Sequence, residues 1–301
     1  MNDRPFLFVK GKIGFGILIY FLFLSAAAIF PQRVVSLAPG LTEIVFALNR
    51  GSTLVGVTKF CDYPAAARDI KKIGGLLDIN IEAIVSLAPD IVLIYPEHYD
   101  KVKFLRQRTR IVMVRHNRLS DLLQSILEIG RSLRAEKQAW QLFISIQEKM
   151  RDISQRVKGR AKVRTLFVAG RNADELKNMY IIGNKDFMND LLEIAGGTNA
   201  YRGNVEYPSI SLESVIFLDP EFILEISAHY EGIADEKVLE LWHPYTMVSA
   251  VAKKQIRIIK DSFWLRPGPR VGQIAEGLAG FFAGTEKFQA NENGSPNDSS
   301  H

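Results

Sequence analysis

The side chains most suited to ligand chemistry in this sequence are aromatic, and they gather just after predicted strands. They are Phe60, Tyr63, Tyr95 and Tyr99 in the first half, and Tyr180, Tyr207, Tyr230, Phe263 and Trp264 in the second. Ligands of open α/β sheets lie at the carboxyl ends of the strands, where flat rings suit a large, partly apolar molecule. Arg266 could orient such a ligand through hydrogen bonds. The pattern therefore predicts a binding site.

Motifs for catalysis are missing from the sequence. It has no Gly-x-Ser-x-Gly elbow, no phosphate loop ending in Gly-Lys-Ser/Thr and no His-Glu-x-x-His zinc motif. No two of the five histidines stand at a metal-ligand spacing: His98, His116, His229, His243 and His301. The single cysteine, Cys61, is expected to be a small buried side chain. We therefore expect a binding protein without a catalytic residue, metal or cofactor.

Short β-branched runs alternate with helical stretches, which favours α/β units around mostly parallel sheets. Predicted strands cover 33–38, 54–58, 90–95 and 110–114 in the first half and 164–169, 221–226 and 255–259 in the second. A helix is predicted over 41–48. These elements place the aromatic residues above at the ends of strands.

One helix–strand segment occurs twice, 131 residues apart. The copies are INIEAIVSLAPDIVLI, beginning at Ile79, and ISLESVIFLDPEFILE, beginning at Ile210. They share a candidate N-cap, a glutamate and a proline: Asn80 and Ser211, Glu82 and Glu213, Pro89 and Pro220. The repeat predicts two similar lobes, and chance similarity of two helix–strand units is the alternative.

A long helix is predicted between the two halves, over 135–158. Its apolar residues recur at alternating spacings of four and three: Ala139, Phe143, Ile146, Met150, Ile153 and Val157. Gly159 ends it. A helix of about 24 residues is roughly 36 Å long, which is enough to run along both lobes.

The chain resembles the substrate-binding proteins of ABC importers for cobalamin and ferric siderophores. Five stretches carry the resemblance: RVVSLAPGLTEIVFAL, CDYPAAA, INIEAIVSLAPDIVLI, PSISLESVIFLDPEFIL and DSFWLRPGPRV. It extends from Arg33 to about Gly284. It implies two Rossmann-like α/β lobes joined by one long rigid helix, with the ligand in the cleft between them. It also implies that Glu82 and Glu213 dock on the two subunits of an ABC importer permease dimer.

Within that family the cobalamin binders look most similar, because 61–64 matches their Cys-x-Tyr-Pro pattern. Their pattern also has an aromatic residue about six positions before each lobe glutamate. The second lobe of this chain matches it with Tyr207, whereas the first lobe departs from it with Leu76. Heme binders of the family use a tyrosine near Leu76 and Leu77, and none is present. We predict cobalamin or a related metal chelate as ligand, with a ferric siderophore as the alternative. A membrane-anchored extracytoplasmic enzyme is the alternative from another class.

The predicted ligand site combines three tyrosines of the first lobe with four residues of the second: Tyr63, Tyr95, Tyr99, Tyr207, His229, Trp264 and Arg266. Trp264 is expected to present its ring to the ligand, because the following Arg266–Pro267 stiffens the backbone. The alternative is that Trp264 fills the base of the second lobe as a core residue.

The two ends of the chain differ from its body. Residues 1–28 combine a cationic start, most of an apolar run over 13–30 and an alanine-rich exit, which predicts a secretory signal peptide. An uncleaved membrane anchor is the alternative. Residues 285–301 are polar and are predicted to form a disordered tail. The body then comprises lobes over 33–134 and 161–284, and it is expected in the periplasm.

Composition sets the remaining limits. The 301 residues are 47% hydrophobic and 24% charged, values of a folded globular protein. The formal net charge is +5, and it is too small and too scattered to predict a nucleic-acid partner. We expect a monomer.

Overall fold

The computed structural model describes residues 32–76, 78–228, 230 and 232–284. The predicted signal peptide, the predicted tail and His229 therefore lie outside the described residues. The described residues from Arg33 to Gly284 belong to one compact unit. No helix within the described ranges has the length and apolar character needed to cross a membrane.

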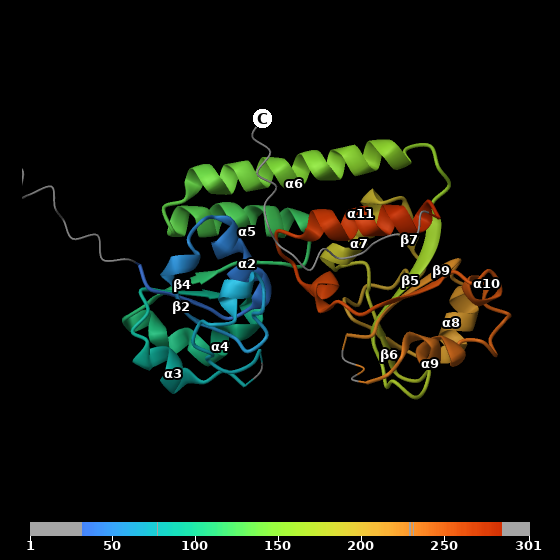
Figure 1. The fold of residues 1–301 in the computed structure, drawn as a ribbon, viewed down its shortest axis with the longest axis horizontal. Coiled ribbons are helices and arrows are strands. Elements are labelled where there is room, and N and C mark those ends of the chain that lie inside the picture. The colour runs from blue at the N-terminus through green and yellow to red at the C-terminus, as the bar shows by residue number, and fades with distance from the viewer. Residues whose placement is uncertain (1–31, 77, 229, 231, 285–301) are drawn as a thin grey trace, which may run out of the picture. The chain divides into compact units, whose positions relative to one another are not determined.

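The first lobe is built on a four-stranded sheet in the order β2-β1-β3-β4, with all neighbours parallel (Figure 1). Its strands are β1 (Val34–Ser36), β2 (Leu54–Val57), β3 (Ile91–Ile94) and β4 (Arg110–Met113). Its helices are α2 (Pro39–Ala47), α3 (Ile81–Ser86), α4 (Tyr99–Val102) and α5 (Leu119–Ser132). The four predicted strands and the predicted helix of this half are confirmed.

The second lobe is built on a six-stranded sheet. Its strands are β5 (Val163–Gly170), β6 (Met179–Ile181), β7 (Gly197–Asn199), β8 (Ser209–Ile210), β9 (Phe222–Ile226) and β10 (Ile256–Ile259). β10, β9, β5 and β7 pair in parallel, whereas β6 and β8 add an antiparallel edge. The helices are α7 (Phe187–Ile194), α8 (Leu212–Leu218), α9 (Asp235–Glu240), α10 (Ser249–Ala252) and α11 (Val271–Phe282). Sequence patterns predicted β5, β9 and β10 but missed the three short strands.

Alternating side chains cover both faces of each sheet. In β3, Ile91 and Leu93 point into one hydrophobic cluster and Val92 and Ile94 into another. In β9, Phe222 and Leu224 likewise belong to the first of these clusters, whereas Ile223 faces a third. This two-residue alternation between buried faces is what parallel strands require. The first cluster is shared by the two lobes, which is why the chain forms a single compact unit.

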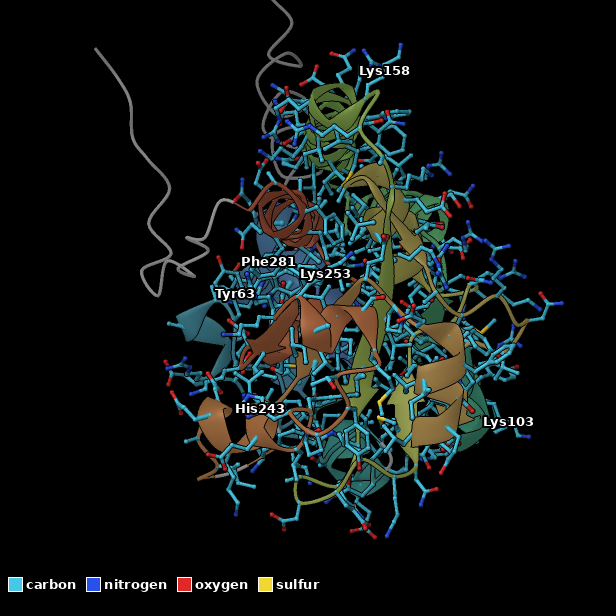
Figure 2. The ribbon with its side chains drawn as sticks, turned by 90° about the vertical axis from the view of Figure 1, so that its right-hand side faces the viewer. Tyr63, Lys103, Lys158, His243, Lys253 and Phe281 are labelled. Carbon is cyan, nitrogen blue, oxygen red and sulfur yellow. The ribbon has the colours of Figure 1, made fainter. Side chains whose placement is uncertain are left out.

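Helix α6 (Glu136–Val157) connects the lobes and packs on α5 of the first and on α7 and α11 of the second (Figure 1). Its predicted stripe is confirmed. Ala139, Ile146, Met150 and Ile153 are buried, and Phe143 and Val157 pack against the same cluster. At 1.5 Å per residue, its 22 residues span about 33 Å. Lys158, labelled in Figure 2, is its C-cap residue.

The internal repeat is present in three dimensions. In both copies an arginine donates its backbone N–H to an acidic side chain and its guanidinium to a leucine carbonyl. The residue after that leucine has a φ of 42° in the first copy and 40° in the second. The matched pairs, each 131 residues apart, are Arg33 and Arg164, Leu87 and Leu218, Ala88 and Asp219, and Asp90 and Glu221. Chance similarity of two helix–strand units does not produce such matched hydrogen bonds.

Candidate functional site: the facing surfaces of the two lobes

A buried ion pair joins the lobes where α2 approaches the start of α11. Glu43 of α2 is 3% exposed and lies against Arg270, the N-cap residue of α11. Arg270 Nε donates to Glu43 Oε2 over 2.9 Å, and Nη2 donates to Oε1 over 2.7 Å. Burial raises the pKa of Glu43, and the bonds from Arg270 act in the opposite direction. Such a bidentate pair fixes the relative orientation of its two elements.

Arg266 forms the second charged contact between the lobes. Its Nη1 donates to Asp62 Oδ1 over 2.5 Å and its Nη2 to Oδ2 over 3.2 Å. Within its own lobe, Nη2 also donates to Ser262 Oγ over 2.7 Å. Partial burial raises the pKa of Asp62, but the hydrogen bond and charge of Arg266 outweigh it and lower the pKa overall. The Asp62 side chain is half exposed, so ligand groups can reach this pair.

Gly40 allows the backbones of the two lobes to touch. A Cβ at this position would lie 2.2 Å from the Pro267 carbonyl oxygen and 2.8 Å from the Tyr95 hydroxyl oxygen. The Tyr95 hydroxyl donates to that same Pro267 carbonyl over 3.3 Å. Tyr95 is only 6% exposed, and burial raises its pKa further above its ordinary value. Any larger residue at position 40 would have to push the two lobes apart.

Two aromatic rings hold Arg270 in place. Its Cζ lies 4.2 Å from the centre of the Tyr63 ring and 4.3 Å from that of Phe263. Tyr63 is 37% exposed, and Figure 2 shows it at the edge of the molecule. Cation–π contacts of this kind orient a guanidinium without using its N–H donors. Tyr63 therefore offers an accessible ring beside the charged contacts.

A second polar contact forms between β4–α5 and the loop before β8. Asn117 Nδ2 donates to Glu206 Oε1 over 2.6 Å, which links the lobes. Next to Asn117, His116 contacts the Tyr95 ring at 4.0 Å between ring centres and hydrogen-bonds Glu97 over 3.2 Å. Beside Asn117, Arg118 donates through Nε to Asp190 Oδ2 of α7 over 3.0 Å, which adds another ion pair between the lobes. Tyr95 thus contacts Pro267 through its hydroxyl and His116 of this second region through its ring.

Asp186 and Tyr207 extend this contact into the second lobe. The Tyr207 hydroxyl donates to Asp186 Oδ2, while Asp186 Oδ1 caps α7 by accepting from Met188 N over 2.7 Å. Burial raises the pKa of Asp186 to about 6, against the opposing effect of these two hydrogen bonds. Tyr207 is 44% exposed, so its ring stays accessible while its hydroxyl is fixed.

Comparison with known proteins agrees with this architecture. A family model for periplasmic binding proteins matches residues 34–262, which is most of the chain. The chain belongs to the periplasmic binding protein family. The expectation from the sequence motifs, of two α/β lobes joined by a long helix, is confirmed.

Proteins similar to this periplasmic binding protein are named for different ligands. A vitamin B12-binding protein of Vibrio vulnificus is 28% identical, covering 90% of this chain and 96% of the relative. An uncharacterized ABC transporter substrate-binding lipoprotein of Bacillus subtilis is 28% identical, covering 83% of this chain and 79% of the relative. The vitamin B12-binding protein of Vibrio cholerae superimposes with a TM-score of 0.72 at 22% identity, covering 85% and 98% of the two chains. The V. cholerae heme-binding protein reaches 0.74 at 20% identity, covering 84% and 99%.

The structure brings together four of the seven predicted ligand residues of this periplasmic binding protein. Tyr63, Tyr95 and Arg266 surround the charged contacts, and Tyr207 lies at the second polar contact. Tyr99 is elsewhere. It packs against the cluster on the other face of the first sheet, and its hydroxyl accepts from Arg106 over 3.0 Å.

Trp264 is a core residue rather than an accessible ring. It is 1% exposed, and its ring stacks on Phe281, labelled in Figure 2, at 5.9 Å between centres. It belongs to the cluster shared by the two lobes. The 3₁₀ turn Ser262–Leu265 points the tryptophan inward while Arg266, two residues later, points toward Asp62. The alternative that the sequence left open is therefore the one the structure adopts.

Sequence reasoning did not select several residues of these contacts as site residues: Glu43, Asp62, His116, Asn117, Asp186, Glu206 and Arg270. Glu43 and Arg270 pair across 227 positions, so no local spacing relates them. Of these residues, only Asp62 lies inside the Cys-x-Tyr-Pro segment, which already indicated the site. Cys61 beside it is buried as expected, and it lies 3.2 Å from Thr42 Oγ1.

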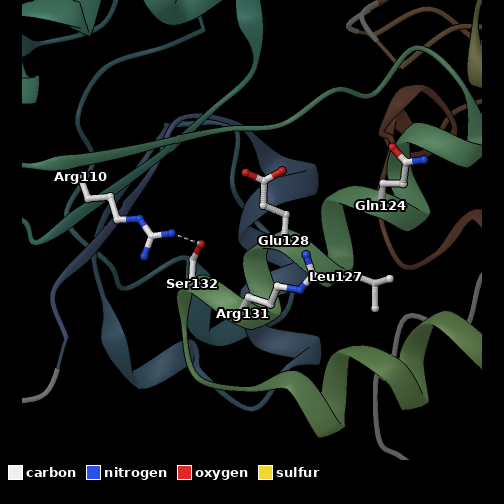
Figure 3. Close-up of a pocket in the computed structure, with 6 residues that line it drawn as sticks. All are labelled: Arg110, Gln124, Leu127, Glu128, Arg131 and Ser132. Atoms are coloured by element: carbon white, nitrogen blue, oxygen red, sulfur yellow. Dashed lines mark hydrogen bonds between the residues drawn. The ribbon is translucent and has the colours of Figure 1, made fainter.

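A pocket of about 470 Å³ lies elsewhere, between β4 and α5 on the outer side of the first lobe (Figure 3). It is lined by Arg110, Gln124, Leu127, Glu128, Arg131 and Ser132. The Arg110 guanidinium donates to Ser132 Oγ over 3.3 Å, as Figure 3 shows. None of the inter-lobe hydrogen bonds, ion pairs and ring contacts given above involves these residues, so we do not assign the pocket to the binding site. The described part of the chain contains no cluster of three potential metal-ligating side chains.

Proposed function

We propose that this chain is the periplasmic receptor of an ABC importer and that it carries a cobalamin between its two lobes. The observation that carries the proposal is the set of facing groups that couple the lobes: Glu43, Asp62, Tyr63 and Tyr95 against Arg266, Pro267 and Arg270. A ligand held there contacts both lobes at once and thereby biases their arrangement. The names of the vitamin B12-binding relatives support this ligand class.

Charge favours an amide-rich ligand over an anionic one. Carboxyl groups outnumber guanidinium groups where the lobes face each other: Glu43, Asp62, Glu97, Asp186, Asp190 and Glu206 against Arg118, Arg266 and Arg270. Carboxylates repel the acidic groups of heme and of catecholate siderophores. The side-chain amides of a corrin ring are neutral and both donate and accept hydrogen bonds. They suit a surface that offers carboxylate acceptors beside guanidinium donors.

The existing inter-lobe hydrogen bonds can be exchanged for bonds to such a ligand. Arg266 with Asp62, and Asn117 with Glu206, pair groups that are only partly buried. Pairs with solvent access contribute little net free energy, about 0–1 kcal/mol. An amide that accepts from Arg266 and donates to Asp62 replaces both partners without leaving a polar group unsatisfied. The exposed rings of Tyr63 and Tyr207 then cover apolar parts of the ligand.

Titration calorimetry with a ligand panel tests the proposal. We expect the protein to bind cyanocobalamin, and to bind hemin and an anionic ferric catecholate at least tenfold more weakly. Arg266→Gln, which shortens the side chain, removes its charge and replaces the forked donors with one amide, should weaken cyanocobalamin binding about tenfold, or 1.4 kcal/mol. Tight binding of a ferric siderophore without cobalamin binding would transfer the proposal to iron import. Chemical conversion of any of these compounds would favour an enzyme.

Glu82 and Glu213 are the proposed docking residues for the permease dimer. Each is exposed in the first turn of its helix, α3 or α8, after an N-cap residue whose side chain accepts a backbone N–H: Asn80 from Ala83 and Ser211 from Ser214. A favourable helix dipole accounts for each glutamate singly. Their equivalent placement in both lobes is what a partner with two similar subunits would engage.

Replacing both glutamates with alanine should reduce uptake at least tenfold and leave cyanocobalamin affinity within twofold of the parent. The physical reason is that neither side chain takes part in the inter-lobe contacts. Uptake by cells that carry the complete importer is the measurement. The matched control is Glu136→Ala/Glu148→Ala, which removes two exposed glutamates from α6. Normal transport by the Glu82/Glu213 double variant would refute the docking role.

A further inference from the structure

The helices that carry the two docking glutamates also expose apolar side chains beside them. Phe217 of α8 is 87% exposed, more than any other large apolar residue described, and its neighbour Ile216 is 37% exposed. On α3, Val85 is 51% exposed. Single exposed apolar residues are common on protein surfaces, but adjacent ones beside a charge indicate an interaction site.

The spacing puts these residues on the same helix face as the glutamates. Ile216 and Phe217 follow Glu213 by three and four positions, and Val85 follows Glu82 by three. Residues so spaced are neighbours on a helix surface. The inward faces are occupied by Ile84 and Val215, each 0% exposed. Each helix therefore buries one face in its lobe and presents a glutamate with apolar neighbours on the other.

The repeat places the two surfaces at equivalent positions, but the second lobe exposes more apolar surface than the first. At the offset of 131 residues, Glu82 matches Glu213 and Val85 matches Ile216, whereas the exposed Ser86 matches Phe217. Both α3 and α8 pack on the sheet faces opposite to the cluster that α6 covers. Figure 1 shows both helices well away from α6. One partner with two similar surfaces can thus meet both helices at once.

We propose that each docking surface pairs an apolar contact with its glutamate, Val85 on the first lobe and Ile216 with Phe217 on the second, and that the second lobe contributes more to permease binding. The inference rests on the proposed function. Its occupant is the importer's permease dimer, with a cation set in an apolar surface on each subunit. The matched placement of the two surfaces supports this choice, since a dimer presents two similar subunits and the exposed carboxylates of Glu82 and Glu213 stand at equivalent positions of the repeat. A contact that buries apolar surface around an ion pair also excludes water from it.

The test measures binding of the cyanocobalamin-loaded receptor to the permease dimer in lipid nanodiscs. Phe217→Ser should weaken this binding at least tenfold, and Val85→Ser about threefold or less. Ser86→Phe, which copies the second-lobe residue into the first, should strengthen it. Trp140→Ser is the matched control, because it removes a half-exposed ring from α6 and should change nothing. Cyanocobalamin affinity, measured separately by calorimetry, should be the same for all four variants.

The outcomes separate this inference from the proposed function. If Phe217→Ser binds the permease as tightly as the parent while Glu82→Ala/Glu213→Ala does not, the apolar contact is wrong and the docking glutamates stand. If the unmodified receptor binds neither cyanocobalamin nor the permease, the proposed function itself fails. If Phe217→Ser instead abolishes self-association in size-exclusion chromatography, or binding to protein-free vesicles of the same lipids, the occupant is a second copy or the bilayer, and the proposal is overturned.

Discussion

Replacing Trp264 with alanine should lower the free energy of unfolding by about 3–5 kcal/mol, one of the two largest effects we expect in this protein. The ring is 1% exposed and belongs to the hydrophobic cluster shared by both lobes. It stacks on Phe281 of α11 and is tilted against Phe263 at 6.2 Å between ring centres. Alanine leaves a cavity that this close-packed region can only partly fill. Urea denaturation followed by circular dichroism gives the change.

Trp140→Ala is the control for this experiment. Trp140 is 50% exposed on α6 and packs edge-on against Phe143 at 5.2 Å. Its replacement should cost no more than about 1 kcal/mol, the value of such an aromatic pair. If Trp264→Ala unfolds at the same urea concentration as the parent and loses cyanocobalamin binding instead, the ring belongs to the ligand site and not to the core.

Glu43→Ala should cost about 3 kcal/mol of stability, because it leaves the Arg270 guanidinium largely buried without its carboxylate. The Glu43 side chain is 2% exposed and that of Arg270 is 15% exposed. Removing one partner of a buried ion pair typically costs 3–5 kcal/mol. The lower end applies here because Arg270 keeps some solvent and its contacts with two aromatic rings. Thermal and urea unfolding both report the loss.

Glu276→Ala is the matched control, since Glu276 also accepts from two cations, Lys149 and Arg156, but is 35% exposed. Its loss should cost no more than about 1 kcal/mol. The double variant Glu43→Ala/Arg270→Ala should be less destabilised than the sum of the two single variants, because the uncompensated charge is gone. Equal costs for Glu43→Ala and Glu276→Ala would contradict this prediction, because the buried inter-lobe pair would then contribute no more than an exposed one.

Lobe coupling in this protein comes from two kinds of contact with different consequences. The hydrophobic cluster that passes beneath α6 from one lobe to the other is non-directional and holds them together. The polar contacts between the lobes are directional, and the partly buried ones, Arg266 with Asp62 and Asn117 with Glu206, are exchangeable. If the ligand binds between the lobes as proposed, we expect it to exchange these polar contacts while the cluster remains closed.

Local patterns in the sequence were sufficient for the apolar parallel strands, for the helix that connects the lobes and for the family. Val34–Ser36, Ile91–Ile94 and Phe222–Ile226 are short apolar runs, and buried parallel strands need such runs whatever surrounds them. The stripe of α6 follows from helical periodicity alone. The N-cap residues Asn80 and Ser211 act through backbone groups three positions away. Each of these features depends on residues close together in the chain.

The tertiary structure alone decided which side chains meet between the lobes. Glu43 and Arg270 are 227 residues apart, and Asp62 and Arg266 are 204 apart, so no spacing in the sequence connects them. The direction of Trp264 was likewise open, because a ring on a turn can face either the core or the solvent. Only the packing of α11 and its Phe281 against that turn makes the inward position favourable. Such pairings arise from the docking of whole elements, which local sequence does not encode.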